Sequence, residues 1–348
     1  METFWFIALT FMLIMYVILD GFDLGAGIIH LLVGKSDNER RTILNAIGPV
    51  WDGNEVWLIA AGGVLFLAFP LLYASSFSGF YLMWMIMIWL LMLRGLGIEF
   101  RGHIHNPMWK SFWDVVFSMG SMLLAVLLGA ALGNVVRGVP LNAEGYFFEP
   151  LWTTFTVVPE AGMLDWFTVL IGLVAFFTLT AHGANYVAMK TENEVQIRSR
   201  SCARTANWFV FITSFLALIA TSFIRPSIWD KYLNHPWGFV FPFLSLMSLF
   251  GMFYYRFQIN DTRAFLASSA FILGMGTSTA FGLYPNVLPA STNPDYNLTI
   301  YNTAAGEYGL SVGLVWWSVG IVLAGVYFTY LYYSIKGKIK VPAKGEGY

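Results

Sequence analysis

The sequence predicts an all-α, polytopic integral membrane protein, and three observations support this fold class. Of the 348 residues, 57% are apolar and only 11% are charged, whereas about a quarter of the residues of an ordinary soluble domain are charged. Nine windows are apolar over the length that crosses a bilayer, which is about 20 residues. Connections that contain many Lys and Arg residues alternate along the chain with connections that contain few. We therefore expect a single transmembrane domain over residues 1–348 with about nine transmembrane helices.

Each predicted helix corresponds to one apolar window. The first window lacks a basic segment before it and a small-residue cleavage site after it, so we expect a retained helix rather than a signal peptide. The first, fifth and ninth windows are long enough to tilt or to project beyond the bilayer. The windows are 3–31, 55–74, 77–99, 112–136, 160–189, 204–223, 236–255, 263–283 and 309–335.

The first and fifth windows both end in a polar segment that contains glycine, at Asp20–Gly27 and Thr178–Asn185. This weak repeat suggests two four-helix bundles, in halves 1–136 and 160–283, followed by the last helix at 309–335. The connections at 137–159 and 284–308 are the longest outside the bilayer. They are either caps over an external mouth or ordinary connections.

Loop charge predicts the orientation, because Lys and Arg accumulate on the cytoplasmic side of a membrane. Of the 19 basic residues, only Arg137, Arg225 and Lys231 lie in the sparse set of connections. The rich set includes the tail with Lys336, Lys338, Lys340 and Lys344. An odd number of spans then places the N-terminus outside and the C-terminus in the cytoplasm.

Several functional classes are excluded by composition and motif. The net charge of −1 gives no sign of a nucleic-acid partner, and the single cysteine, Cys202, excludes an intramolecular disulfide and a multi-cysteine metal site. No Walker A motif, zinc-site spacing, Rossmann fingerprint or hydrolase elbow is present. We therefore predict no catalytic residues and no metal ligands in this chain.

Four carboxylates are candidates for proton transfer, because ionisable groups within a span usually face a bundle interior or water. Asp20 and Asp23 lie three residues apart in the first helix and share a face, and Asp52 and Glu55 repeat that spacing at the start of the second. Close carboxylates in a partly desolvated site share protons near neutral pH. The alternatives are a helix-end role for Asp52 and salt bridges for the others.

Charged residues at the ends of the third and fourth helices are candidates for tuning these carboxylates: Arg94, Glu99, Arg101 and Asp114. Arg94 and Arg101 either neutralise the carboxylates, bind an anionic headgroup, or follow the positive-inside rule. His182 is the histidine that we place well inside a span, and we favour a hydrogen-bonded interior histidine over a haem ligand. We place His30, His103, His105 and His235 in or near loops.

Several segments resemble subunit II of cytochrome bd-type quinol oxidases. They are Leu19-Asp-Gly-Phe-Asp-Leu-Gly-Ala-Gly, Asn38-Glu-Arg-Arg, Pro49-Val-Trp-Asp-Gly-Asn-Glu-Val-Trp-Leu-Ile-Ala-Ala-Gly-Gly, Ser76-Phe-Ser-Gly-Phe-Tyr, Gly129-Ala-Ala-Leu-Gly-Asn-Val-Val-Arg-Gly-Val-Pro and Tyr284-Pro-Asn-Val-Leu-Pro-Ala-Ser-Thr. The resemblance covers most of the chain and is most specific in the first 140 residues. One departure is Glu55, where a glutamine is common in relatives.

The resemblance implies a heterodimer in a prokaryotic plasma membrane that oxidises quinol and reduces dioxygen to water. Subunit I would carry haem b and haem d, and this chain would contribute assembly and a cytoplasmic proton route through Asp52, Asp20, Asp23 and Glu55. It also implies contact with membrane lipid and quinone, and it admits a small single-span accessory subunit. The sequence leaves two rivals open: a proton-coupled membrane transporter and a purely structural partner of the haem subunit.

Overall fold

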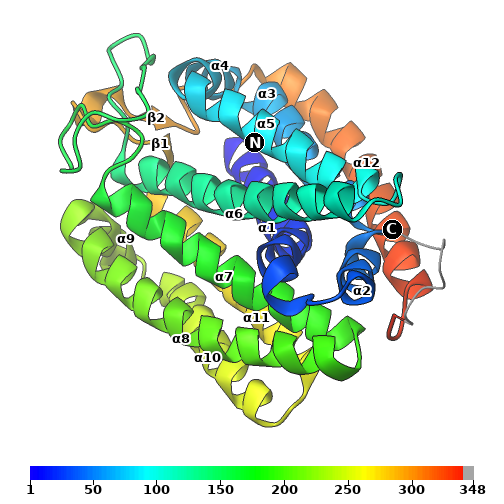
Figure 1. Ribbon diagram of the computed structural model, residues 1–348. Helices are drawn as coiled ribbons and strands as arrows, with labels where there is room; N and C mark the ends of the chain where they lie inside the picture. The colour runs from blue at the N-terminus through cyan, green and yellow to red at the C-terminus, as the bar shows by residue number, and fades with distance from the viewer. Residues whose placement is uncertain (340–348) are drawn as a thin grey trace.

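The computed structural model describes residues 1–339, so Lys340 and Lys344 lie outside the described residues. Figure 1 shows long helices packed side by side, with little other regular structure. The all-α fold class is thereby confirmed. The elements are α1 (Glu2–Val33), α2 (Asp37–Ile47), α3 (Trp51–Ala68), α4 (Pro70–Gly79), α5 (Tyr81–Phe100), α6 (Pro107–Arg137), α7 (Trp166–Lys190), α8 (Asn193–Ile224), α9 (Ser227–Asn234), η1 (Pro236–Phe239), α10 (Val240–Phe257), α11 (Asp261–Leu283), β1 (Asn286–Leu288), η2 (Pro294–Tyr296), β2 (Leu298–Thr299) and α12 (Glu307–Ser334).

Eight helices in the described part of the chain are long and apolar enough to cross a membrane. They are α1, α5, α6, α7, α8, α10 with η1, α11 and α12. The predicted second span, 55–74, is not one helix, because the chain breaks between α3 and α4 at Phe69 and Pro70. Proline lacks an N–H and disfavours the helical conformation of the residue before it. A ninth crossing, through α3 and α4, stays a prediction.

Two other predicted boundaries were wrong. The fifth helix was expected from 160, but α7 begins at Trp166 because Asp165 caps it: one side-chain oxygen of Asp165 accepts hydrogen bonds from the backbone N–H groups of Phe167 and Thr168, at 2.8 and 2.9 Å. The sixth was expected from 204, but α8 begins at Asn193. Its first turns carry charged side chains, which a search for apolar windows passes over.

Helix α1 is at the centre of the bundle and packs against α3, α6, α7 and α11. Its contact with α7 depends on two glycines: a Cβ added to Gly183 would lie 2.3 Å from the carbonyl carbon of Gly25. No side chain fits between the two backbones, so glycine allows this close approach. Elsewhere in the bundle, α7 packs against α8 and α10 packs against α11, while α12 packs against α3. The division into halves stays a prediction.

One end of the bundle carries the two long connections, and we call it the outer end because the sequence predicts it outside. Residues 138–165 and 284–306 meet there: the N–H of Val139 donates to the carbonyl of Pro289 at 3.0 Å, and the N–H of Ser291 donates to the carbonyl of Val139 at 2.9 Å. Strands β1 and β2 form an antiparallel pair within the second connection. These loops lie against each other rather than extending separately.

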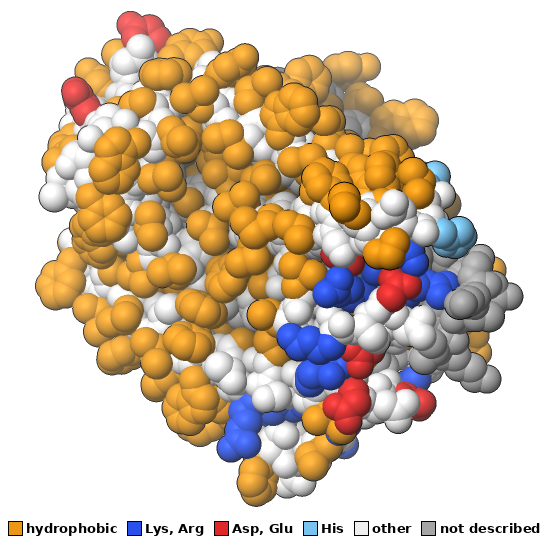
Figure 2. All heavy atoms as spheres, in the orientation of Figure 1, with side chains coloured by type: hydrophobic (Ala, Val, Ile, Leu, Met, Phe, Trp, Pro, Cys, Tyr) orange, Lys and Arg blue, Asp and Glu red, His pale blue; other side chains and the backbone are white. Residues whose placement is uncertain are grey.

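The opposite end, which we call the inner end, holds α2 and the last described residues (Figure 1). Figure 2 shows acidic and basic side chains gathered toward that side, while hydrophobic side chains cover most of the rest of the face. Exposed apolar surface of this extent is expected where a helix bundle contacts lipid rather than water. The orientation itself stays a prediction.

Candidate functional site

Helices α1, α3 and α5 bring four ionisable side chains together toward the inner end. We call Asp20, Asp23, Glu55 and Arg94 the inner carboxylate cluster. Asp20 and Asp23 share one face of α1, and Glu55 lies in the second turn of α3. Asp20 and Arg94 are fully buried, and the exposed fraction of Asp23 is only 1%. Three of the four sequence-predicted carboxylates, Asp20, Asp23 and Glu55, therefore lie together in the fold.

Arg94 joins two of these carboxylates through separate nitrogens. Its Nη1 atom donates to both oxygens of Asp20, at 2.7 and 2.8 Å, and its Nη2 atom donates to Oε2 of Glu55 at 2.8 Å. Charge-assisted bonds of this kind hold a guanidinium and its partners in one geometry. The side chain of Glu55 is 22% exposed, so it connects the buried pair with the surface of the chain.

Asp23 has a different partner, the side-chain amide of Asn54. The Nδ2 atom of Asn54 donates to Oδ2 of Asp23 at 2.7 Å, and its Oδ1 atom accepts from the hydroxyl of Tyr332 at 2.8 Å. The other oxygen of Asp23 is buried without a hydrogen-bond partner in the described residues. A buried unsatisfied carboxylate oxygen is costly unless it carries a proton or contacts water.

Two of the predicted site residues lie at the surface of the chain. Asp52 is exposed at the start of α3, one turn before Glu55, and Glu99 is exposed near the end of α5. Neither forms an ion pair within residues 1–339. Asp52 thus adjoins the inner carboxylate cluster without being part of its hydrogen-bond network.

Arg101 and Asp114 form a second cluster, closer to the inner end. Nε of Arg101 donates to Oδ1 of Asp114 at 2.6 Å, and Nη2 donates to Asp37 at 2.8 Å. Arg40 donates to Oδ2 of Asp114 at 3.0 Å. Partial desolvation opposes ionisation of the exposed Asp37 side chain, but hydrogen bonds from Lys110 and Arg101 hold its pKa below the usual value. The structure therefore places Arg101 with Asp114 and Asp37 rather than with Asp20 or Asp23.

His30 was expected in or near a loop, and it does lie close to the end of a helix, but its burial was missed. It is fully buried in the last turn of α1, where its Nε2 atom lies 2.6 Å from Oδ1 of Asp114. The apolar window ended at residue 31, which placed His30 at a helix end. Asp114 supplies the partner that one nitrogen of this buried ring requires, while Nδ1 has no hydrogen-bond partner in the described residues.

His182 is a hydrogen-bonded interior histidine. Its Nε2 atom lies 2.9 Å from the carbonyl oxygen of Ile18, and its Nδ1 atom lies 2.7 Å from the hydroxyl of Ser268. The ring stacks on Phe265. Both ring nitrogens are thus engaged, and neither is directed at a haem iron in this arrangement.

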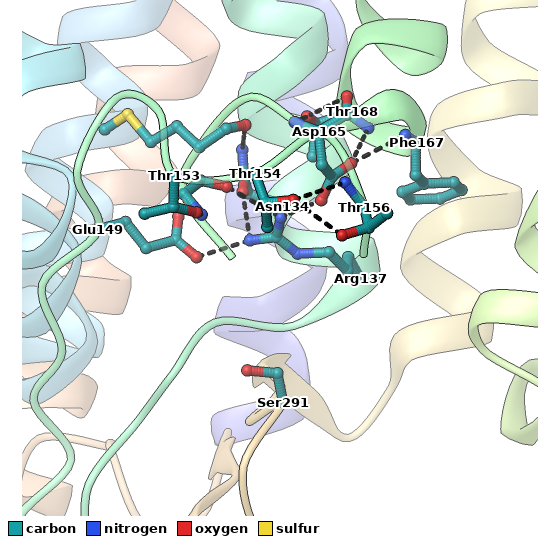
Figure 3. Close-up of polar contacts among 12 residues, drawn as sticks. Asn134, Arg137, Glu149, Thr153, Thr154, Thr156, Asp165, Phe167, Thr168 and Ser291 are labelled. Carbon is teal, nitrogen blue, oxygen red and sulfur yellow. Dashed lines mark hydrogen bonds and ion pairs between the residues drawn. The ribbon is translucent and has the colours of Figure 1, made fainter. Parts of the chain in front are cut away.

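A third cluster, at the outer end, has Arg137 at its centre (Figure 3). The guanidinium donates to Glu149 at 2.6 Å, to the side chain of Asn134 at 2.7 Å, and to Asp165. Glu149 and Asp165 are fully buried. Arg137 ends α6 and Asp165 caps α7, so these bonds attach the connection between the two helices to both of them.

The outer cluster contains two carboxylates and one guanidinium. Oε2 of Glu149 is buried and has no hydrogen-bond partner in the described residues. Burial raises the pKa of Glu149 to about 8; the charge of Arg137 opposes this rise and that of Asp165 adds to it. A protonated Glu149 leaves the remaining pair, Arg137 and Asp165, electrically neutral.

Sequence reasoning missed several of these residues for different reasons. Asn54 lies between Asp52 and Glu55 in the motif Trp51-Asp-Gly-Asn-Glu, so its place in that motif could have marked it as a site residue. Tyr332 is 278 positions away from Asn54, and no spacing rule connects them. Glu149 and Asp165 lie in or next to a loop, where a carboxylate is ordinarily solvated and attracts no notice.

The comparisons with known proteins agree across the whole chain. A family model described as cytochrome bd terminal oxidase subunit II matches residues 1–335. The probable cytochrome oxidase subunit 2 of Haemophilus influenzae is 31% identical, over 96% of this chain and 94% of that protein. The cytochrome bd-I ubiquinol oxidase subunit 2 of Escherichia coli K12 is 30% identical, with the same coverage.

A solved structure shares the fold. The bd oxidase from Geobacillus thermodenitrificans contains a chain that matches with a TM-score of 0.73 and 17% sequence identity, covering 95% of this chain and 97% of that one. The identity is low, so this likeness concerns the fold alone.

Proposed function

The chain belongs to the cytochrome bd terminal oxidase subunit II family, and we propose that its inner carboxylate cluster is part of the route by which protons reach the oxidase from the cytoplasm. The chain is one subunit of a quinol oxidase complex and a multi-pass bacterial membrane protein. In the proposed complex, a partner subunit I carries haem b and haem d, quinol supplies electrons, and dioxygen is reduced to water. Contacts with lipid, quinone and a small accessory subunit belong to the same proposal.

The observation that carries the proton route is the graded burial of its carboxylates. Asp52 is exposed, the side chain of Glu55 is 22% exposed, and Asp20 is fully buried. Asp52 and Glu55 lie three residues apart on α3, and Glu55 shares Arg94 with Asp20. A proton that binds at the surface of the chain therefore has acceptors at increasing depth.

Charge balance supports exchangeable protons at this site. One guanidinium, that of Arg94, faces three carboxylates: Asp20, Asp23 and Glu55. Removing several charges from water without full compensation is unfavourable, so a buried cluster with excess carboxylate binds protons. Arg94 keeps part of the cluster ionised, and the remaining negative charge attracts a proton.

Asn54 and Tyr332 act as positioning residues in this proposal. The amide of Asn54 fixes one oxygen of Asp23 at 2.7 Å and is itself fixed by Tyr332 from α12. The second oxygen of Asp23 remains available to a proton or to water. This arrangement orients Asp23 without neutralising it.

The two buried histidines, His30 and His182, are fully enclosed by this chain and leave no exposed ring edge for a haem. Both ring nitrogens of His182 are engaged, and His30 is paired with Asp114. A haem requires an axial ligand whose lone pair faces the iron. We therefore assign the haems to the partner subunit.

The test uses the complete complex, purified through this chain from a strain that produces Asp20→Asn, Asp52→Asn or both. Proton uptake from the inner side and quinol oxidase turnover would be measured in liposomes, and the reduced-minus-oxidised spectrum would report haem content. We expect normal haem bands with turnover and uptake reduced together. Glu99→Gln is the matched control, because Glu99 is an exposed carboxylate at the same end with no ion pair in the described chain.

If the double variant has the same turnover, proton uptake and haem content as the wild type, the proposal is wrong and this chain is a structural partner only. Substrate uptake by the purified chain alone would instead favour a transporter.

A further inference from the structure

The outer end has few basic residues, and two of them line one cavity. Arg137 is bound by Glu149 and Asp165, whereas Arg225 and Lys231 open onto a cavity of about 210 Å³ between α9, the end of α11 and β1. Figure 1 shows α9 at the same end as β1 and β2. Basic residues are disfavoured on this side of a membrane protein, so two in one cavity require a physical reason.

The lining of the cavity is polar as well as basic. Ser227, Lys231 and Asn234 line it from α9, and their spacing of four and three residues places them on one face of that helix. Asn286 contributes from β1. The cavity therefore offers two cations together with neutral hydrogen-bonding groups, which is the chemistry of an oxyanion site.

Arg225 has no acidic partner in the part of the chain that the structure describes. Its side chain makes no ion pair or hydrogen bond within residues 1–339, and burial lowers the pKa of its guanidinium. A partly desolvated guanidinium is ordinarily paired, because its five donors and its charge lose water. The ammonium of Lys231 lies 4.8 Å from the ring centroid of Tyr284, a cation–π contact that leaves its charge uncompensated.

The neighbouring acids do not neutralise this pair. Asp230 lies next to Lys231 in sequence but is exposed and does not line the cavity. Glu2, whose charge acts on Tyr284, pairs with the N-terminal amine at 3.1 Å. Residues 1–339 therefore supply no carboxylate partner for Arg225 or Lys231.

We propose that Arg225 and Lys231 bind the phosphate of an anionic lipid headgroup in the outer leaflet. A phosphate oxyanion accepts the paired donors of a guanidinium and the point charge of a lysine. The surroundings favour a lipid over a free phosphate ion, because Phe223 is 79%, Leu233 67% and Trp237 65% exposed beside the cavity's elements. Tryptophan and apolar residues at this level contact acyl chains and headgroups. None of this depends on the proton route.

The test is lipid-dependent thermal stability of the delipidated complete complex. Wild type, Arg225→Gln, Lys231→Gln and the double variant would each be titrated with phosphatidylglycerol, phosphatidylcholine and inorganic phosphate. We expect phosphatidylglycerol to raise the melting temperature of wild type. Each single variant should need about tenfold more of the lipid and the double variant about a hundredfold more, since each charge-assisted bond contributes about one factor of ten. Arg204→Gln, which removes an exposed cation at the inner end, is the matched control and should respond as wild type.

Equal responses of wild type and the double variant to phosphatidylglycerol would overturn the site. A response to inorganic phosphate that matches the lipid response would overturn the assignment to a headgroup. Should the double variant fail to assemble, a photoactivatable phosphatidylglycerol on the wild-type complex decides: labelling within 223–237 or 282–286, the two segments that line the cavity, supports the site, and labelling confined to other segments contradicts it.

Discussion

Arg94 of α5 contacts both carboxylate oxygens of Asp20 of α1, at 2.7 and 2.8 Å, with neither side chain exposed. The two residues are 74 positions apart, so only the packed bundle joins them. The guanidinium also reaches Glu55 on α3. The Arg94 side chain thus connects three helices at the proposed proton-transfer site. The same hydrogen bonds therefore hold the helices together and set the charge of the proton-transfer groups.

Replacing Arg94 tests the structural role. Arg94→Gln leaves Asp20 buried without its cation, and breaking a buried pair costs about 3–5 kcal/mol. We expect a much lower yield of assembled complex and a lower melting temperature. The double variant Arg94→Gln with Asp20→Asn removes both charges and should recover most of the loss; a double variant as unstable as the single one would contradict the pairing argument.

Glu55 offers a milder test of proton transfer, because its removal leaves Arg94 paired with Asp20. We expect Glu55→Gln to assemble with normal haem bands, since glutamine is common at this position in relatives. It should lower quinol oxidase turnover by up to roughly tenfold, because one positioned proton-transfer group is lost while Asp20, Asp23 and Asp52 remain. The measurement is oxygen consumption at saturating quinol between pH 6 and 9. Unchanged turnover across that range would remove Glu55 from the route.

The outer cluster predicts a pH dependence of stability. The pKa of Glu149 is raised from 4.5 to about 8 in the folded chain, so the native state binds a proton that the unfolded state releases between those values. The stabilisation that this proton gives the folded chain is complete below pH 4.5 and is lost as the pH rises to about 8. Over that range the free energy of unfolding falls by at most about 1.4 kcal/mol per pH unit. Melting temperatures of the complex from pH 5 to 9 would show this slope.

Glu149→Gln should flatten that part of the profile, because glutamine resembles the protonated acid. Glu144→Gln and Glu160→Gln change exposed glutamates in the same loop and are the matched controls. A wild-type slope in Glu149→Gln would assign the pH dependence to other groups.

The contact of α1 with α7 predicts a steric effect. In Gly183→Ala the new Cβ would meet the Gly25 backbone at 2.3 to 2.4 Å, so the helices must separate, at a cost of about 1–3 kcal/mol or more. Gly309→Ala, where nothing lies within 4 Å of an added Cβ, should be neutral. Thermal unfolding of the two variant complexes would separate these outcomes, and equal melting temperatures would rule out the close packing.

The sequence by itself determined the membrane class, most of the helices and the family resemblance. These follow from local properties: apolar length, glycine and proline positions, and a motif of adjacent residues such as Trp51 to Glu55. The carboxylates Asp20, Asp23 and Glu55 were also recognisable, because a charge in an apolar window is conspicuous in a sequence, and Asp52 was recognisable because it repeats the three-residue spacing just before the second window.

Only the tertiary structure decided which of these charges meet. It paired Arg94 with Asp20 and Glu55, directed Arg101 to Asp114, buried His30, and left Asp52 and Glu99 at the surface. It also revealed the outer cluster of Arg137, Glu149 and Asp165 and the cavity of Arg225 and Lys231. Partners in a helix bundle are set by helix rotation and side-by-side packing over long sequence separations, and neither hydropathy nor spacing encodes these.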